Sequence, residues 1–190
     1  GLPQRVRGHV GLGKRHAIEV EDEVTAFLDY GTYSGVFTTT TGEAPGTNRL
    51  EVAAERGKIV IEHGEMNWTR NVQPMSEFCR TTTGGFTKPD VWYVKIPVNG
   101  WGGQHNEILQ NFVGAITVGA PLMAPAVEGI RSVELGNAML LSGLTDRTLS
   151  LPLDSAFVDA EFAKLKAISK PHAKKVAAGV PSDFTSSFGR

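Results

Sequence analysis

VNGWGGQHNEILQNFVGAI, residues 98–116, opens the stretch that decides the fold class of this chain. After its glycine-rich turn, apolar residues recur at steps of three and four, the spacing of an amphipathic helix: Ile108, Leu109, Phe112, Val113 and Ile116. We expect this helix to bury one face and to end at Gly119. Pro121 and Pro125 then predict an extended connection, because proline lacks an N–H donor and disfavours helical geometry in the residue before it.

A second helix is predicted from about Val127 to Ser142, where EGIRSVELGNAMLLS carries apolar residues on two sides and small residues between them. This pattern indicates a helix packed closely between neighbours. A short strand is predicted from Thr148 to Leu153. Asp154 is then placed to cap a third helix, from Ser155 to about Ile168.

The first half of the chain predicts strands, because β-branched, aromatic and alternating residues lie between turn signals. In Glu23–Tyr30 the alternation places Val24, Ala26, Leu28 and Tyr30 on one face, which is expected to pack against the helices. The expected strands are Val6–Val10, Glu23–Tyr30, Tyr33–Thr41, Arg49–Ala54, Ile59–Glu62, Glu65–Arg70, Met75–Thr82 and Val91–Val98. Short turns between consecutive strands favour antiparallel pairing. The fold class is therefore α+β: an open, mostly antiparallel sheet with helices packed on one face. The other face stays available to a ligand, a partner domain or another subunit.

Composition narrows the class of protein. The 190 residues, 41% of them hydrophobic, are enough for a single core, and one domain is expected. Nineteen basic and twenty acidic residues leave a net charge of -1, which argues against nucleic acid as a partner. No apolar run predicts a membrane span, and no signal peptide is recognisable, so the expected location is cytoplasmic. Cys79, the only cysteine, is interpreted as a small packed residue inside a strand.

The usual catalytic and cofactor motifs are missing. Gly11 and Gly13 lack the third glycine and the following helix of a dinucleotide fingerprint, and no phosphate-binding loop is present. The histidines show no metal-ligand spacing, and no serine, histidine and aspartate set can be assigned. We therefore predict no catalytic, cofactor-binding or metal-binding residue in this chain.

His105 is the candidate binding residue. It opens the first helix, where free backbone N–H groups and the helix dipole attract hydroxyl oxygens and anions. Gln104 and the aromatic Trp101 lie beside the same turn and complete the candidate substrate-binding set. The alternative is a cap formed by Gln104 or Asn106, with His105 merely solvated.

Several segments together resemble the C-terminal domain of the Gfo/Idh/MocA family, the relatives of glucose–fructose oxidoreductase and inositol dehydrogenase. The segments are EVEDEVTAFLDYGTYSGVF (19–37), NRLEVAAERGKIVIE (48–62), QNFVGAITVGAP (110–121), EGIRSVELGNAMLLS (128–142) and RTLSLPLD (147–154). The resemblance implies NAD or NADP bound by an N-terminal Rossmann domain that is absent from this chain, so no cofactor is expected here. It also implies that residues 1–170 bind substrate and form the oligomer, followed by an extended tail over residues 171–190.

The family's catalytic lysine, in an EKP motif, and its aspartate and histidine, in a GGxxxDxGxH pattern, do not occur in this chain. The resemblance places them upstream of Gly1, so the chain is expected to be inactive by itself. A tyrosine that contacts substrate in family members is matched by His105. The expected function is the substrate-binding and oligomerisation half of an NAD(P)-dependent sugar or polyol dehydrogenase. Its expected partners are a sugar or polyol, the Rossmann domain and further copies of the chain, which meet through the sheet face.

The alternative function is a free-standing, non-catalytic module that binds a sugar or a protein. The length of the natural reading frame separates the two. An upstream Rossmann pattern favours the dehydrogenase half, and a start codon just before Gly1 favours the module.

Overall fold

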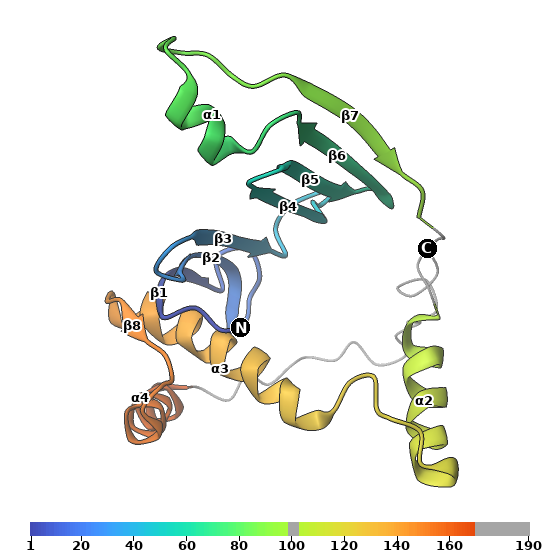
Figure 1. Ribbon diagram of the computed structural model, residues 1–190. Coiled ribbons are helices and arrows are strands. Elements are labelled where there is room, and N and C mark those ends of the chain that lie inside the picture. Colours follow the sequence, from blue (N-terminus) through green and yellow to red (C-terminus); the bar gives the residue numbers. More distant parts are fainter. Residues whose placement is uncertain (99–102, 170–190) are drawn as a thin grey trace. The chain divides into compact units, whose positions relative to one another are not determined.

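The computed structural model describes residues 1–98 and 103–169 (Figure 1). Their strands form two four-stranded sheets, in the orders β3-β2-β1-β8 and β4-β5-β6-β7, and neighbouring strands in both sheets pair antiparallel. The strands are β1 (Arg5–Leu12), β2 (Glu21–Asp29), β3 (Ser34–Thr40), β4 (Arg49–Ala54), β5 (Gly57–Glu62), β6 (Glu65–Asn71), β7 (Val91–Ile96) and β8 (Leu149–Ser150). The helices are α1 (Met75–Thr81), α2 (Gln104–Val118), α3 (Ala126–Thr145) and α4 (Ser155–Ile168). The described chain divides after Leu151 into two units.

The predicted α+β class with antiparallel strands is confirmed, although the strands belong to two sheets instead of one. The helix boundaries also follow the sequence closely. Gly119 ends α2 in the left-handed conformation, with φ 70°. Asp154 caps α4, since its Oδ1 accepts a hydrogen bond from the Ala156 N–H at 3.0 Å. The predicted tail, residues 171–190, lies outside the described residues.

The buried core lies where α3 packs on the sheet of β1 and β2. Alternation along the two strands directs one set of side chains toward the helix. Its fully or nearly buried apolar residues are Val6, Val24, Ala26, Ala138, Leu141 and Leu149. This core confirms the inward face predicted for β2 and positions the strand that lines the groove described below.

A very close approach of backbones joins α3 to β1. A Cβ atom at Gly8 would lie 2.3 Å from the Met139 carbonyl oxygen, so only glycine fits there. The buried Ser142 fixes the contact, because its Oγ accepts the Gly8 N–H at 2.8 Å and donates to the Arg147 carbonyl at 2.7 Å. Ala138 and Ser142, two of the small residues that the sequence places along this helix, are buried and serve close packing, as predicted.

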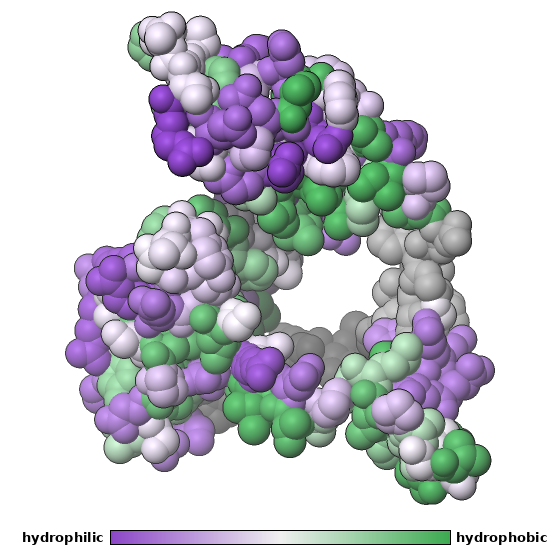
Figure 2. All heavy atoms as spheres, viewed as in Figure 1, coloured by the Kyte–Doolittle hydropathy of each residue, from purple (hydrophilic) through white to green (hydrophobic). Residues whose placement is uncertain are grey.

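That close packing is limited to the C-terminal half of α3. Ile130 and Val133, which the pattern predicted to be sandwiched between neighbours, are 66% and 64% exposed. The face of α2 that was expected to be buried is exposed as well, with Ile116 at 70%. Both expectations are wrong within the described residues, because no described element covers these two faces. Figure 2 shows such hydrophobic side chains at the surface.

The sheet of β4 to β7 has one apolar and one polar face. Its register places on one face Leu50 and Val52 of β4, Ile59 and Ile61 of β5, Met66, Trp68 and Arg70 of β6, and Trp92, Val94 and Ile96 of β7. The opposite face carries ion pairs such as Arg49 with Glu62 and Lys95 with Glu65. No residue of these four strands is buried, so the apolar face is uncovered by the described residues.

The strand predicted from Met75 to Thr82 is wrong, because this segment forms the helix α1. Pro74 precedes the helix, where its missing N–H is tolerated. Glu55 satisfies two first-turn donors: its carbonyl accepts the Met75 N–H at 2.9 Å and its carboxylate accepts the Ser76 N–H at 3.0 Å. Cys79 is consequently an exposed helical residue, not a packed strand residue.

No helix within residues 1–98 and 103–169 is long and apolar enough to cross a lipid bilayer. Within the same residues, no three His, Cys, Asp or Glu side chains lie close enough together to hold a metal ion.

Candidate functional site

The start of α2 carries the binding residues predicted from sequence, and the structure describes them in part. Trp101 lies outside the described residues, as does the side chain of Gln104. His105 is exposed on the first turn. Gly103 takes the N-cap position, and the Glu107 carboxylate accepts its N–H at 3.0 Å. A negative charge of the chain itself thus already occupies this helix end, which favours a neutral ligand over an anion.

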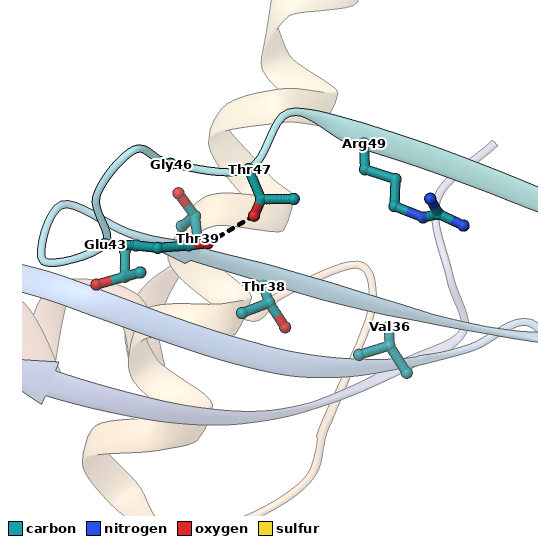
Figure 3. A pocket seen from close by; sticks show the side chains of 8 residues that line it. Val36, Thr38, Thr39, Glu43, Gly46, Thr47 and Arg49 are labelled. Carbon is teal, nitrogen blue, oxygen red and sulfur yellow. Dashed lines mark hydrogen bonds between the residues drawn. The ribbon is translucent and has the colours of Figure 1, made fainter. Parts of the chain in front are cut away.

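A second candidate site is a groove between β3 and the segment that leads into β4 (Figure 3). We call it the threonine groove. Its volume is about 440 Å³, and its lining residues are Val36, Thr38, Thr39, Thr40, Glu43, Gly46, Thr47 and Arg49. This volume lies within the ~300–1,000 Å³ typical of small-molecule sites. The groove is more polar than most such sites, because four of its lining residues are threonines.

The two charged residues of the threonine groove differ in how they are bonded. The Arg49 guanidinium binds Glu51 at 2.5 Å and Glu62 at 2.6 Å. The hydrogen bonds that Arg49 donates to these two carboxylates raise its pKa. Glu43 accepts a hydrogen bond from the Thr47 hydroxyl at 2.6 Å (Figure 3). No cation among the described residues lies within ion-pair distance of Glu43. The groove therefore contains a neutralised arginine and an uncompensated carboxylate.

The carboxylate of Asp22 fixes the loop that precedes β2. Its side chain is fully buried and accepts the N–H groups of Lys14 at 3.0 Å, Arg15 at 2.6 Å and His16 at 2.9 Å. Burial opposes ionisation of Asp22, but these backbone hydrogen bonds outweigh it and lower its pKa to about 2. Asp22 thus remains charged at neutral pH and holds residues 14–16 in one conformation.

The same loop contacts the beginning of the threonine groove. The Thr41 N–H donates to the Asp22 carbonyl at 3.0 Å, and the Thr41 hydroxyl lies 3.1 Å from His16 Nδ1. The side chain of Arg15 packs so closely on Gly42 that a Cβ there would lie 2.4 Å from Arg15 Cγ. Asp22 therefore positions residues 41 and 42, from which the groove segment starts.

Sequence reasoning missed the threonine groove and the role of Asp22. The run of threonines in β3 and the glycines and proline of the following loop are visible in the sequence, but they indicate only a strand and a turn. The hydrogen bonds of Asp22 could not be anticipated from its alternating position in β2, which equally suits a solvated residue.

In comparisons with known proteins, no family model and no curated protein matches the sequence. Solved structures do match. The WlbA dehydrogenase from Chromobacterium violaceum, solved with NADH and UDP-GlcNAcA, has a TM-score of 0.59 at 23% identity, over 81% of this chain and 41% of that one. An oxidoreductase domain protein from Kribbella flavida has a TM-score of 0.58 at 12% identity, over 78% and 44% of the two chains.

An oxidoreductase from Agrobacterium radiobacter, solved with NAD+, L-tartaric acid and magnesium, has a TM-score of 0.55 at 12% identity, over 85% of this chain and 45% of that one. The chain shares its fold with part of each of these oxidoreductases. It spans less than half of the length of each of these three proteins. The structural match confirms the fold that the sequence resemblance implied.

The described residues do not fit the nicotinamide dinucleotide found in two of these structures. A dinucleotide pyrophosphate is held where a parallel strand turns through glycines into a helix. Both sheets of the described chain are antiparallel, and they contain no parallel strand–helix–strand unit. No step of hydride transfer is therefore assigned to these residues.

Proposed function

We propose that this chain is the substrate-binding and self-associating half of an NAD(P)-dependent sugar or polyol oxidoreductase. The observation that carries the proposal is the fold shared with the C-terminal half of oxidoreductases. Two of these proteins were solved with a nicotinamide cofactor together with a hydroxylated ligand, UDP-GlcNAcA or L-tartaric acid. The cofactor and the proton-transfer groups would come from residues other than those of this chain.

In this division of labour, the chain orients hydroxyl groups of the substrate. His105 is the proposed contact, together with Gln104 and Trp101. His105 is exposed on the first turn of α2, so its side chain is accessible to a substrate hydroxyl. The Glu107 carboxylate at the same helix end would accept from a hydroxyl and repel an anionic group.

Calorimetric titration with NAD+ and NADP+ tests the division of labour. We expect no binding to the 190-residue chain and micromolar binding to the product of the complete reading frame. Micromolar binding to the 190-residue chain would contradict the proposal, and so would a reading frame that encodes no further domain.

Replacing His105 tests the substrate contact. In the complete enzyme, His105→Ala should reduce kcat/KM for the preferred sugar or polyol by roughly ten- to a hundredfold, the effect of losing one or two well-placed hydrogen bonds. Gln110→Ala, an exposed change on the same helix, is the matched control and should leave kcat/KM unchanged. Equal kinetics of the two variants would remove His105 from the site.

We also propose that the apolar face of the β4–β7 sheet meets the same face of a second copy. This face presents Trp92 at 52% exposure and Val52 at 51%. The Arg70 guanidinium lies between two indole rings, 5.5 Å from the centroid of Trp68 and 4.5 Å from that of Trp92. Tryptophan and arginine are the residue types most enriched at the energetic centres of protein interfaces. A self-complementary face of this kind suits a two-fold dimer.

Two valines on opposite faces of the same sheet test the self-association. Val52 belongs to the apolar face and Val60 to the face that carries the ion pairs. We expect light scattering to show a dimer for the unmodified chain and for Val60→Lys, and a monomer for Val52→Lys. A monomeric unmodified chain at high concentration, or equal dissociation by both substitutions, would contradict the interface.

A further inference from the structure

The wall of the threonine groove carries threonine hydroxyl groups whose positions are restricted. Thr38 and Thr40 lie two residues apart in β3, so their side chains share one face of the strand, and the groove segment adds Thr47. A threonine side chain has few rotamers, and its hydroxyl can donate one and accept two hydrogen bonds. Neighbouring hydroxyls of this kind match the alternating donors and acceptors of a polyhydroxylated compound.

The charges around the groove disfavour an anionic ligand. Arg49 already binds Glu51 and Glu62, and Glu51 also binds Lys58 at 3.0 Å. Together with Glu43, this group contains two cations and three carboxylates, which leaves one net negative charge. An anionic ligand would have to displace a carboxylate from Arg49 and approach Glu43, whereas an amine would gain an ion pair with Glu43.

We propose that the threonine groove binds a small polyhydroxylated ligand that carries no negative charge, and that Glu43 makes the groove prefer an amine-bearing ligand over a neutral one. The α2 start contributes no residue to this lining, so the inference goes beyond the proposed function and does not depend on it. The Thr38 and Thr40 hydroxyls would bond to ligand hydroxyls while the Glu43 carboxylate accepts from an ammonium group.

The groove is preorganised for this role. Asp22 holds residues 14–16, and these in turn fix Thr41 and Gly42 at the base of the groove segment. A wall that is already ordered costs little entropy on binding. The groove is nevertheless open and polar, so we expect dissociation constants on the order of 1 mM.

Three linear polyols that differ at one carbon test the proposal: sorbitol, which is neutral, glucamine, which carries an ammonium group, and gluconate, which carries a carboxylate. Ligand- and protein-observed NMR titrations of the 190-residue chain at neutral pH measure affinities in this range. We expect glucamine to bind about fivefold more tightly than sorbitol, the effect of one exposed ion pair. Gluconate should bind more weakly than either.

Variants locate the binding. Glu43→Gln should remove the preference for glucamine over sorbitol while sorbitol binding persists. Glu128→Gln makes the same charge change outside the groove and should keep the preference for glucamine. Thr38→Val, which keeps the side-chain shape and loses the hydroxyl, should weaken all three polyols at least threefold, the effect of losing one hydrogen bond. Thr83→Val is the control for the hydroxyl, since Thr83 is exposed and does not line the groove.

Chemical-shift changes confined to residues 36–49, with glucamine tighter than sorbitol and sorbitol tighter than gluconate, would support the proposal. It would be overturned by the absence of binding at tens of millimolar polyol, by gluconate binding most tightly, or by Thr38→Val and Thr83→Val behaving alike. Since no cofactor or turnover is measured, these results leave the proposed oxidoreductase role independently testable.

Discussion

Substitution by alanine should change the free energy of unfolding differently at two glycines of α3. A Cβ atom at Gly143 would lie 2.4 Å from Val10 Cγ2 and 3.0 Å from the Val10 backbone nitrogen. At Gly136, seven residues earlier in the helix, nothing lies within 4 Å of a Cβ atom. Gly143 is thus required by the approach of α3 to β1, whereas Gly136 is not.

The magnitudes follow from two effects. Replacing glycine by alanine inside a helix stabilises it by about 0.8–1 kcal/mol, and both positions share this gain. Only Gly143→Ala adds a steric overlap, which costs about 1–3 kcal/mol in a close-packed core. Gly136→Ala should therefore raise the free energy of unfolding by about 1 kcal/mol, and Gly143→Ala should leave it unchanged or lower it by up to about 2 kcal/mol.

Urea unfolding followed by far-ultraviolet circular dichroism measures both free energies, and thermal melts should separate the two variants by about 2–4 °C for each kcal/mol of difference. A Gly143→Ala variant as stable as Gly136→Ala would refute the close approach of the helix to β1. A Gly136→Ala variant that unfolds more easily than the unmodified chain would show that this part of α3 is covered in solution.

Further predictions concern buried polar groups. Ser142→Ala should lower the free energy of unfolding by about 1–3 kcal/mol in the same urea assay, because the buried Gly8 N–H loses its acceptor. The folded-state pKa of Asp22, about 2, lies below its ordinary value of 3.8, so ionised Asp22 stabilises the fold above pH 3.8 and this stabilisation is lost as the pH falls toward 2. At neutral pH, Asp22→Asn should therefore have a lower free energy of unfolding than the unmodified chain. Between pH 3.8 and about 2, its free energy of unfolding should fall less than that of the unmodified chain, which urea unfolding at several pH values measures. The same Asp22→Asn change should weaken sorbitol binding in the threonine groove, because residues 41 and 42 lose their support.

Local patterns in the sequence determined most of the secondary structure. The spacing of three and four in residues 108–116 predicted α2, Gly119 and Asp154 marked helix ends, and alternation predicted the inward face of β2. These signals are local, since a helix or strand repeats its geometry every few residues. Local patterns gave the wrong element at Met75–Thr82, because the pattern there suits a helix or a strand. The segment is a helix whose first-turn N–H groups are bonded by Glu55, about twenty residues away in the sequence.

The sequence also led to the fold and to His105 as a candidate contact, which remains a prediction. Only the tertiary structure showed that Gly8 and Gly143 permit a helix to touch a strand, that Asp22 is buried among three backbone donors, and that Glu43 and Arg49 line one groove while differing in charge compensation. Each of these depends on atoms brought together by pairings between distant segments. Hydrophobic periodicity states which face of an element is apolar, but the partner of a buried carboxylate or of a close-packed glycine is decided only when the elements meet.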